Sequence, residues 1–514
     1  MILGDGESVT AGGGPRATLD DIFRQAAVRH PKAMALLDSR DRARVADGAP
    51  RRLSYAEADR LASALAARLR GLGLPIDTVV ATHLPNTVES IVTMLGILRA
   101  GMIVAPLPLL WRKADAISAL GRVGAKALIT STRIGAVSHG ELAIQMASEL
   151  FAIRQIFAYG NDVPDGVVPL DDLFTTDKQE PPPPVTRAGN PAAHVAAITF
   201  DVTGDGIVPV PRNHAQLIAG GLGPLLEGRI ALDATMLSAT PISSFGGIAL
   251  TLLPWLLSGG TLALHHPFDL AAFTAQRRAL HCDALVVPGS LVAPLVEIGE
   301  LDDDDLKTVL SLWRAPERLS ETARWRGKAT LVDVTTFGEI GLTAARRDAG
   351  GRFVPFSIGA IGAPRELRNA VPIVEIGRNA DGMLALRGPM APLDAFPPGA
   401  ASGREPHFKV SADGFVDTGY ACRLDADEKT LTITSPPAGI AGVGGYRFVT
   451  RALDALMAEL AADASLFALP DAFTGQRLAG TAPDRARVAA NLAERGTNPL
   501  VAGAFLPRGP AIAA

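Results

Sequence analysis

Apolar positions in the first hundred residues follow two different periods. Segment 54–71 carries leucines at helical spacing behind the capping pair Ser54 and Glu57, which predicts an amphipathic helix. Segment 78–83 is a short apolar run that predicts a buried strand, and a helical pattern and a second strand over 102–106 follow it. Strand, helix and strand in this order predict a parallel βαβ unit and an α/β fold.

Changes in local composition divide the chain. Four consecutive prolines, 181–184, with polar flanks predict a linker between two α/β halves. After about residue 350, short apolar runs with frequent glycine and proline, as in 382–389, predict strands joined by turns. We therefore expect an N-terminal domain of residues 1–435, with subdomains at about 16–180, 190–350 and 351–435, and a small α+β C-terminal domain of residues 436–514.

The overall composition excludes several classes of function. Apolar residues make up 48% of the chain and charged residues 20%, as in globular proteins. A net charge of −4 without a basic block indicates no basic surface that could bind nucleic acid. The most apolar stretches are interrupted by glycine, proline or arginine, so we expect no membrane span. Met1 to Pro15 is acidic and glycine-rich, unlike a targeting signal, and the two distant cysteines fit a reducing compartment, so we expect a cytoplasmic protein.

Seven short motifs occur in a fixed order along nearly the whole chain. They are Leu-Pro-Asn at 84–86, Leu-Arg-Ala-Gly at 98–101 with Val-Ala-Pro-Leu at 104–107, Thr-Thr-Phe-Gly-Glu-Ile-Gly at 335–341, Leu-Arg-Gly-Pro at 386–389, Asp-Gly-Phe with Thr-Gly at 413–419, Val-Gly-Gly-Tyr-Arg at 443–447, and Leu-Pro-Asp with Gly-Gln-Arg at 469–477. In this order they resemble the motifs of the adenylate-forming superfamily of acyl-CoA synthetases, peptide-synthetase adenylation domains and luciferases.

The resemblance implies both a fold and an activity. The implied fold has a large N-terminal region of two α/β subdomains and a distorted β-barrel, followed by a small, shortened α+β C-terminal cap. The implied activity is that of an AMP-forming ligase, which activates a carboxylic acid with ATP and Mg²⁺ and usually passes the acyl group to a thiol such as coenzyme A. A small carboxylic acid or acyl ligand is then the expected partner.

The resemblance also implies a set of site residues. A phosphate loop is implied directly after the strand predicted for 195–200. The residues at nucleotide-binding positions are Thr199, Thr203, Gly204, Arg212, Gly338 and Tyr420. Glu339 matches the superfamily's catalytic, Mg²⁺-associated glutamate. The residues implied for the substrate pocket are Ser244, Phe245, Gly246, Gly247 and Phe337.

The chain departs from the superfamily pattern at charged positions of this site. Asp201 stands where the phosphate loop has a small residue, and Tyr420 replaces the aspartate that binds ribose. Pro436 and Gly442 take the places of an arginine and a lysine, and no lysine follows position 429. Two hypotheses remain open. The chain is an AMP-forming ligase with impaired or atypical adenylation, or it is a catalytically inactive protein that binds an acyl or aryl ligand or a protein partner, a second copy included.

Overall fold

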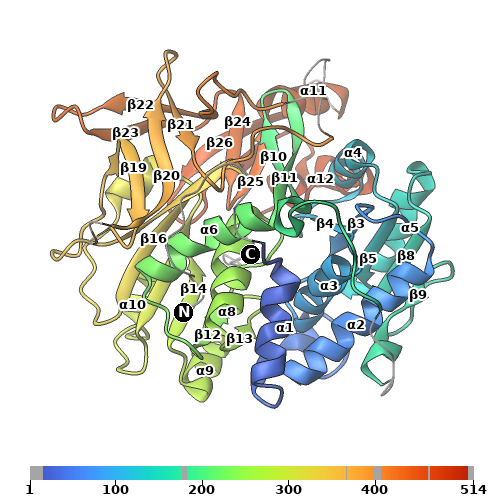
Figure 1. The fold of residues 1–514 in the computed structure, drawn as a ribbon. Helices are drawn as coiled ribbons and strands as arrows, with labels where there is room; N and C mark the ends of the chain where they lie inside the picture. Colours follow the sequence, from blue (N-terminus) through green and yellow to red (C-terminus); the bar gives the residue numbers. More distant parts are fainter. Residues whose placement is uncertain are drawn as a thin grey trace.

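Helices cover the faces of several β-sheets in this protein (Figure 1). The computed structural model describes residues 16–175, 182–365, 367, 369–397, 407–460 and 463–507. The expectations for residues 1–15 and for the start of the linker, 176–181, lie outside the described residues.

The largest sheet has eight strands, and its central strands run parallel. Their spatial order is β17 (Gly341–Arg346), β16 (Thr330–Phe337), β15 (Thr308–Trp313), β14 (Ala284–Pro288), β12 (Thr235–Ser238), β13 (Thr261–Leu264), β1 (Met34–Leu37) and β2 (Arg52–Ser54). Parallel strands buried on both faces explain the near-continuous apolar runs of this part of the sequence.

A second sheet has seven strands and contains the predicted βαβ unit. The order is β11 (Gly206–Asn213), β10 (Val195–Thr203), β4 (Ile103–Pro106), β3 (Val79–His83), β5 (Ala127–Ser131), β8 (Gln155–Tyr159) and β9 (Val168–Pro169). Strands β3 and β4 are parallel and α3 (Val88–Arg99) connects them, so this prediction is confirmed. The capping box of Ser54 and Glu57 at the start of α2 (Tyr55–Gly71) is confirmed as well.

The two large sheets exchange strands along the chain. Strands β10 and β11 follow the linker but join the sheet of the first half, where β10 pairs with β4. Strands β1 and β2 precede that half but join the eight-stranded sheet, where β1 pairs with β13. The strands therefore do not divide between the sheets at the linker.

The remaining α-helices connect these strands and cover their faces. They are α1 (Leu19–Arg29), α4 (Lys113–Val123), α5 (His139–Glu149), α6 (His214–Glu227), α7 (Phe245–Gly247), α8 (Leu253–Ser258), α9 (Leu270–Leu280), α10 (Val292–Glu297), α11 (Thr450–Leu460), α12 (Arg485–Glu494) and α13 (Pro499–Gly503). The short strands β6 (Arg133–Ile134) and β7 (Val137–Ser138) form a separate pair.

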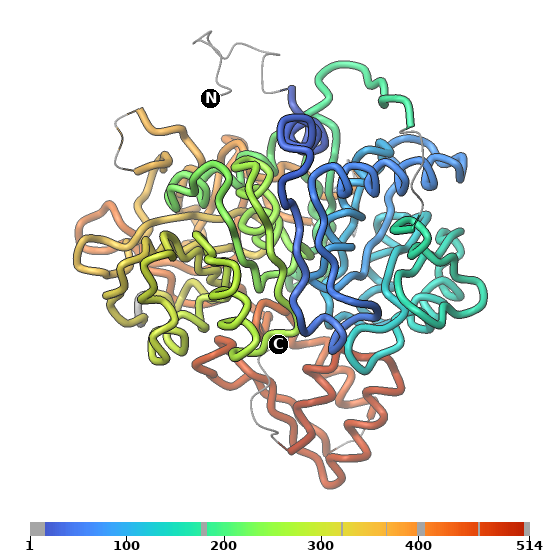
Figure 2. The backbone as a smooth tube through the Cα atoms, turned by 90° about the horizontal axis from the view of Figure 1, so that it is seen from below, coloured from blue at the N-terminus to red at the C-terminus, as the bar shows by residue number. Residues whose placement is uncertain are grey.

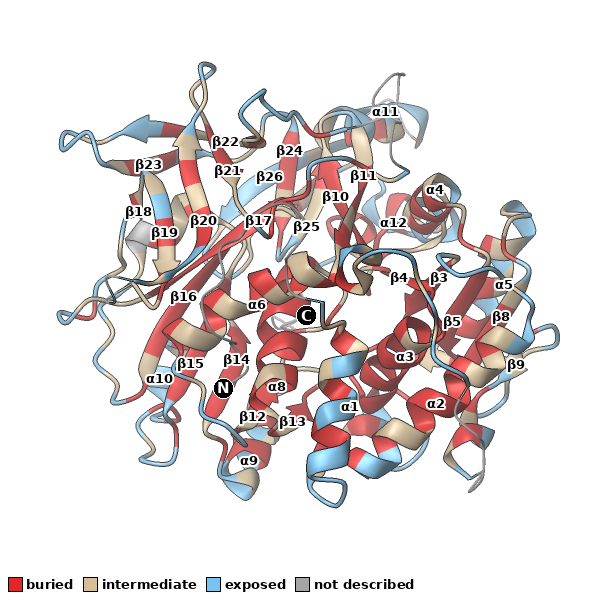
Figure 3. Cartoon of the chain, viewed as in Figure 1, coloured by how far each residue is buried: buried red, intermediate tan, exposed pale blue. Residues whose placement is uncertain are grey.

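Helix α3 is buried on all sides, as its red colour in Figure 3 shows. Its residues from Val88 to Leu98 are buried, and its apolar side chains belong to one core cluster that also contains side chains of α2, α8 and both large sheets. A helix that is apolar all round needs such a surrounding. The two sheets therefore share one core across this helix.

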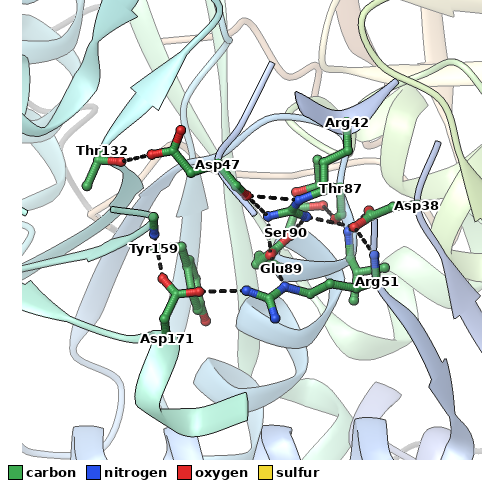
Figure 4. A network of polar contacts seen from close by, with 12 residues as sticks. Asp38, Arg42, Asp47, Arg51, Thr87, Glu89, Ser90, Thr132, Tyr159 and Asp171 are labelled. Carbon is green, nitrogen blue, oxygen red and sulfur yellow. Dashed lines mark hydrogen bonds and ion pairs between the residues drawn. The ribbon is translucent and has the colours of Figure 1, made fainter. Parts of the chain in front are cut away.

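A buried ionic network fixes the start of α3 to the end of β1 (Figure 4). The Arg42 guanidinium donates to Asp38 at 2.7 Å and to both carboxylate oxygens of Glu89 at 2.6 and 2.7 Å. Arg51 donates to Glu89 at 2.6 Å and to Asp171 at 2.6 Å. Burial alone raises the pKa of Glu89, but the two arginines outweigh it and hold this pKa below its usual value. The network therefore links an N-terminal segment of one sheet to the helix of the other.

The last third of the chain adds two smaller sheets. The six-stranded, curled sheet has the order β18 (Phe356–Ser357), β23 (Thr430–Ser435), β22 (Val416–Leu424), β21 (Met383–Arg387), β20 (Val371–Arg378) and β19 (Gly359–Ala363). The four-stranded sheet has the order β25 (Tyr446–Val449), β24 (Ile440–Val443), β27 (Gly475–Thr481) and β26 (Ser465–Asp471).

The segment from β24 to α13 forms a C-terminal cap. In Figure 2 this cap, in red, lies beneath the junction of the two N-terminal halves. It has its own core, which contains Phe448, Leu478 and Phe505. None of the described helices has the length and apolar character that crossing a membrane requires.

Candidate functional site

The segment expected to form a phosphate loop is a β-hairpin. Strand β10 runs on to Thr203 and β11 begins at Gly206, so only Gly204 and Asp205 form the turn. Backbone pairs join 199 with 210, 201 with 208, 202 with 207 and 203 with 206. The expected loop is therefore wrong in conformation, because apolar residues at 200, 202, 207 and 208 favour paired strands over an open turn.

Pairing of the two strands limits what Thr199, Thr203 and Gly204, which the resemblance implies for nucleotide binding, can contact. Thr199 is 2% exposed, and its hydroxyl lies near the Glu339 carboxyl and lowers the pKa of that group. The Thr203 hydroxyl accepts a bond from the Asp205 amide at 3.3 Å, which closes the turn. Gly204 lies beside the backbone of Ala438 at the start of the cap. Along the paired strands the backbone N–H groups point alternately to either side, and the Val202 and Asp205 amides bond to the side chains of Asp201 and Thr203, so the N–H groups of this hairpin do not converge as a phosphate would require.

Asp201 lies at the centre of the site, where it joins the hairpin to the cap. Its Oδ1 atom accepts a hydrogen bond from Nη1 of Arg447 at 2.7 Å, and its Oδ2 atom accepts one from the Glu339 amide at 3.0 Å. A Cβ atom built on Gly338, whose φ is +57°, would come within 2.3 Å of the same Oδ2 atom. Asp201 therefore takes the space that a side chain at position 338 would need.

Arg447, on β25 of the cap, connects Asp201 with Tyr420. Its Nη2 atom donates to the Tyr420 hydroxyl at 2.9 Å, and its guanidinium lies 5.5 Å from the centre of the Tyr420 ring. Tyr420 is 3% exposed, and its ring packs edge to face against Phe337 at 5.8 Å. Burial raises the pKa of the Tyr420 hydroxyl, so it stays protonated and neutral. Tyr420 is thus held by a cation of the cap.

Glu339 lies half-buried beside this cluster. Its Oε2 atom accepts a hydrogen bond from the Phe245 amide at 2.6 Å. Burial raises the pKa of Glu339 to about 7, and the nearby Asp201 charge adds to this. A carboxyl group with this pKa is only partly ionised at neutral pH.

Arg212 lies in the protein interior and binds the backbone of the turn at 338–340. Its guanidinium donates to the Glu339 carbonyl, to the Ile340 carbonyl at 3.0 Å and to the Met390 carbonyl at 3.3 Å. The guanidinium also lies 3.7 Å from the centre of the Phe245 ring. Burial lowers the pKa of Arg212 to about 10, which still leaves it charged at neutral pH. This cation is 1% exposed and engaged with backbone carbonyls, so it does not present itself to a phosphate.

The segment implied for the substrate pocket lies largely in the core. Phe245 and Phe337 are fully buried. Gly246 and Gly247 lie against Thr336 and the Pro241 carbonyl, at distances that leave no room for a side chain.

Beside this segment, Ile242 and Ser243 line a cavity of about 10 Å³, about the space of a single water molecule. Ser244 differs from the buried phenylalanines, because its hydroxyl accepts bonds from Arg314 at 3.3 Å and from the Gly247 amide at 3.1 Å.

Further contacts hold the cap over the site. Arg314 donates to the Gly444 carbonyl at 3.4 Å, and the Tyr446 hydroxyl accepts a bond from the Leu110 amide at 3.1 Å. Sequence reasoning missed Arg314, and it quoted Arg447 only as part of a motif. An acid at 201 together with an arginine at 447 is a signal that could have indicated this pair.

The described residues do not fit a Mg·ATP complex. Glu339 is bound to a backbone amide, and the neighbouring carboxylate of Asp201 is paired with Arg447. In nucleotide sites Mg²⁺ is held by one or two ionised carboxylates together with phosphate oxygens, and both carboxylates here are engaged with protein donors.

Comparison with known proteins places these observations in a family. The model of the AMP-binding enzyme family matches residues 23–338. The 2-hydroxy-7-methoxy-5-methyl-1-naphthoate--CoA ligase of Streptomyces carzinostaticus is 26% identical over 478 residues, which cover 90% of this chain and 83% of that protein. The salicyl-AMP ligase / salicyl-S-ArCP synthetase of Mycobacterium tuberculosis is 28% identical over 278 residues, which cover 52% of this chain and 46% of that protein.

A similarity to peptide synthetases covers only a small part of those proteins. Cyclosporin synthetase of Tolypocladium inflatum is 28% identical over 256 residues, which cover 44% of this chain and 2% of that protein. Two of these three relatives are thus matched over less than half of their own length.

Solved structures share the fold at low sequence identity. Mycobacterium smegmatis MbtA has a TM-score of 0.63 and 23% identity, with 94% of this chain and 89% of that chain covered. The amide bond synthetase McbA from Marinactinospora thermotolerans has a TM-score of 0.70 and 17% identity, with 94% of each chain covered. The fold expected from the motifs is confirmed. Since the family model matches more than half of its residues, this chain belongs to the AMP-binding enzyme family.

Proposed function

We propose that this chain is a non-adenylating member of the family, which acts by binding another molecule rather than by activating an acid with ATP. The pairing of the 199–206 backbone within a hairpin carries the proposal, because phosphate binding by a loop needs free and convergent N–H groups. Ancestry in a ligase family does not settle present chemistry.

The charges around Asp201 support the same conclusion. A phosphate approaching this site meets a carboxylate, and two such charges 4 Å apart repel by about 1 kcal/mol even in bulk water. Accepting the nucleotide would also require Arg447 to leave Asp201, which breaks a 2.7 Å ion pair between largely buried side chains. The charged donors that a transition state would need are reduced further, since Pro436 and Gly442 stand in the places of an arginine and a lysine of the superfamily's pattern. Loss of one such donor typically lowers a rate by about 10² to 10³.

A protein partner fits this account better than a small acyl or aryl ligand. The cavity at Ile242 and Ser243 has room for about one water molecule, so this cavity does not accommodate an aryl acid. We place this binding role in the cytoplasm, because both cysteines are free and buried.

A second candidate function is retained because Glu339 keeps its place beside the site. In this candidate the chain is an AMP-forming ligase for an aryl acid, since one relative is a naphthoate--CoA ligase and another a salicyl-AMP ligase. The cap would have to move away from Asp201 before ATP and Mg²⁺ could bind, and coenzyme A or a carrier protein would accept the acyl group.

Acid-dependent exchange of pyrophosphate into ATP separates the two candidates. We expect no exchange above background with naphthoic, salicylic and other aryl acids, for the wild-type chain and for Asp201→Gly alike. Exchange in the wild-type chain that is abolished by Glu339→Ala, but kept by Glu297→Ala at an exposed position of α10, would contradict the proposal and support the ligase.

A further inference from the structure

Strand β26 is an exposed edge of the cap sheet. Among the described residues it pairs only with β27, and the spatial order of strands leaves its other side open. Phe467 is 53% exposed and Leu469 is 37% exposed, and both lie on the same face because side chains alternate along a strand. Phe473, in the following turn, is 38% exposed. Leu466 points to the opposite face and contacts the core of the cap.

The free backbone groups of this edge can be assigned to particular residues. Pro470 has no N–H and therefore fits the side of β26 that does not bond to β27. Gly480, the β27 residue opposite Leu466, donates its amide to the Ala504 carbonyl at 2.9 Å rather than to β26. Bonding direction alternates along a strand, so Leu466, Ala468 and Pro470 direct their backbone groups away from β27.

We propose that β26 pairs with β26 of a second copy of this chain, antiparallel and centred on Ala468. Each Ala468 then exchanges two backbone hydrogen bonds with its counterpart, and each Leu466 amide donates to the Pro470 carbonyl of the other copy. In this register Phe467 stands opposite Leu469 of the other copy on the exposed face. Four hydrogen bonds and two apolar pairs result.

The sequence of β26 favours a second copy over another partner. Residues 465–470 carry no charge, so a two-fold axis places no like charges opposite each other. Edge strands are usually protected by charged side chains, bulges or proline, and Pro470 is the one such device between 465 and 470. Its carbonyl still accepts a bond in the proposed register. The exposed Phe467 and Leu469 are each other's apolar counterparts, as a self-complementary interface requires.

Sedimentation velocity of the full chain, from micromolar to millimolar concentration, tests the pairing. We expect a concentration-dependent dimer that the single variants Phe467→Lys and Leu469→Glu weaken at least about tenfold, since each places a charge against an apolar side chain. The double variant Phe467→Lys/Leu469→Glu should regain dimerisation, because it sets opposite charges across the axis. Phe151→Lys, at a residue that is 92% exposed outside the cap, should leave the dimer unchanged.

Three results would overturn the proposal: a wild-type chain that stays monomeric at millimolar concentration, a dimer that both single variants leave intact, or a double variant no better than the weaker single one. Ala468→Pro gives an independent check, since it removes an outward N–H and should weaken the dimer without adding charge. Circular dichroism of every variant verifies folding. Binding of an extended peptide by a strictly monomeric chain would assign the edge to another partner.

Discussion

Replacing Arg447 by alanine should loosen the cap. The side chains of Arg447 and Asp201 are 14% and 5% exposed, and their nearest N and O atoms are 2.7 Å apart. Removing one partner of such a buried pair costs about 3 to 5 kcal/mol, because the other charge remains without compensation. The bond from Arg447 to Tyr420 adds about 1 kcal/mol. We therefore expect Arg447→Ala to destabilise the folded chain by about 4 to 6 kcal/mol.

A double-mutant cycle with Asp201→Ala isolates the pair. Denaturant unfolding of both single variants and the double variant should give a coupling free energy of about 2 kcal/mol or more. Hydrogen exchange should accelerate at 440–449 in Arg447→Ala. Arg451→Ala is the matched control, since Arg451 and Asp205 form an exposed pair at 3.6 Å whose loss should change stability by less than about 0.5 kcal/mol. Strictly additive effects at positions 201 and 447 would refute the reasoning.

Three other perturbations test the remaining parts of the account. Glu89→Gln should lower the free energy of unfolding by about 3 kcal/mol, because it leaves the buried Arg42 and the partly buried Arg51 underpaired. Glu141→Gln, at an exposed position, should change it little, and equal effects of the two variants in urea titrations would count against a special role for the network. Burial lowers the pKa of His83 from 6.5 to about 4, so the folded state favours the neutral ring and stability should fall as pH drops from about 6.5 towards 4, by up to about 3 kcal/mol. Thermal unfolding of His83→Gln at several pH values should show a smaller fall in stability towards pH 4. A dependence of stability on pH equal to that of the wild-type chain would exclude the His83 ring as its source. Gly338→Thr should lower the free energy of unfolding by about 2 kcal/mol, because φ is +57° at this position and the new Cβ meets Asp201. In calorimetric scans, adding Asp201→Ala should recover part of that loss, and no recovery would mean that backbone strain alone is responsible.

Local elements of the fold followed from the sequence because their determinants lie close together. The capping pair Ser54 and Glu57 lies three residues apart and begins α2 as expected. Strand β3, helix α3 and strand β4 were predicted from one window of about thirty residues, in which the apolar pattern changes period. The fold of the whole chain is predicted by the order of the motifs, which resembles that of a known family.

The exchange of strands between the sheets was not predictable in this way. Strand β1 pairs with β13, more than two hundred positions later, and no local pattern specifies that partner. The roles of the site residues depend on contacts between equally remote parts of the sequence, since Asp201 and Arg447 form a bond although they are 246 positions apart. The hairpin at 199–208 could have been found from its own pattern, because apolar residues at 200, 202 and 208 fit paired strands.

Titration calorimetry of the purified chain with Mg·ATP tests the central claim most directly, because it needs no knowledge of an acid. The account predicts no heat of binding up to millimolar ATP from protein shown to be folded. Micromolar binding that disappears in Glu339→Ala and persists in Glu297→Ala would contradict it, and would mean that the cap releases Asp201 to admit the nucleotide.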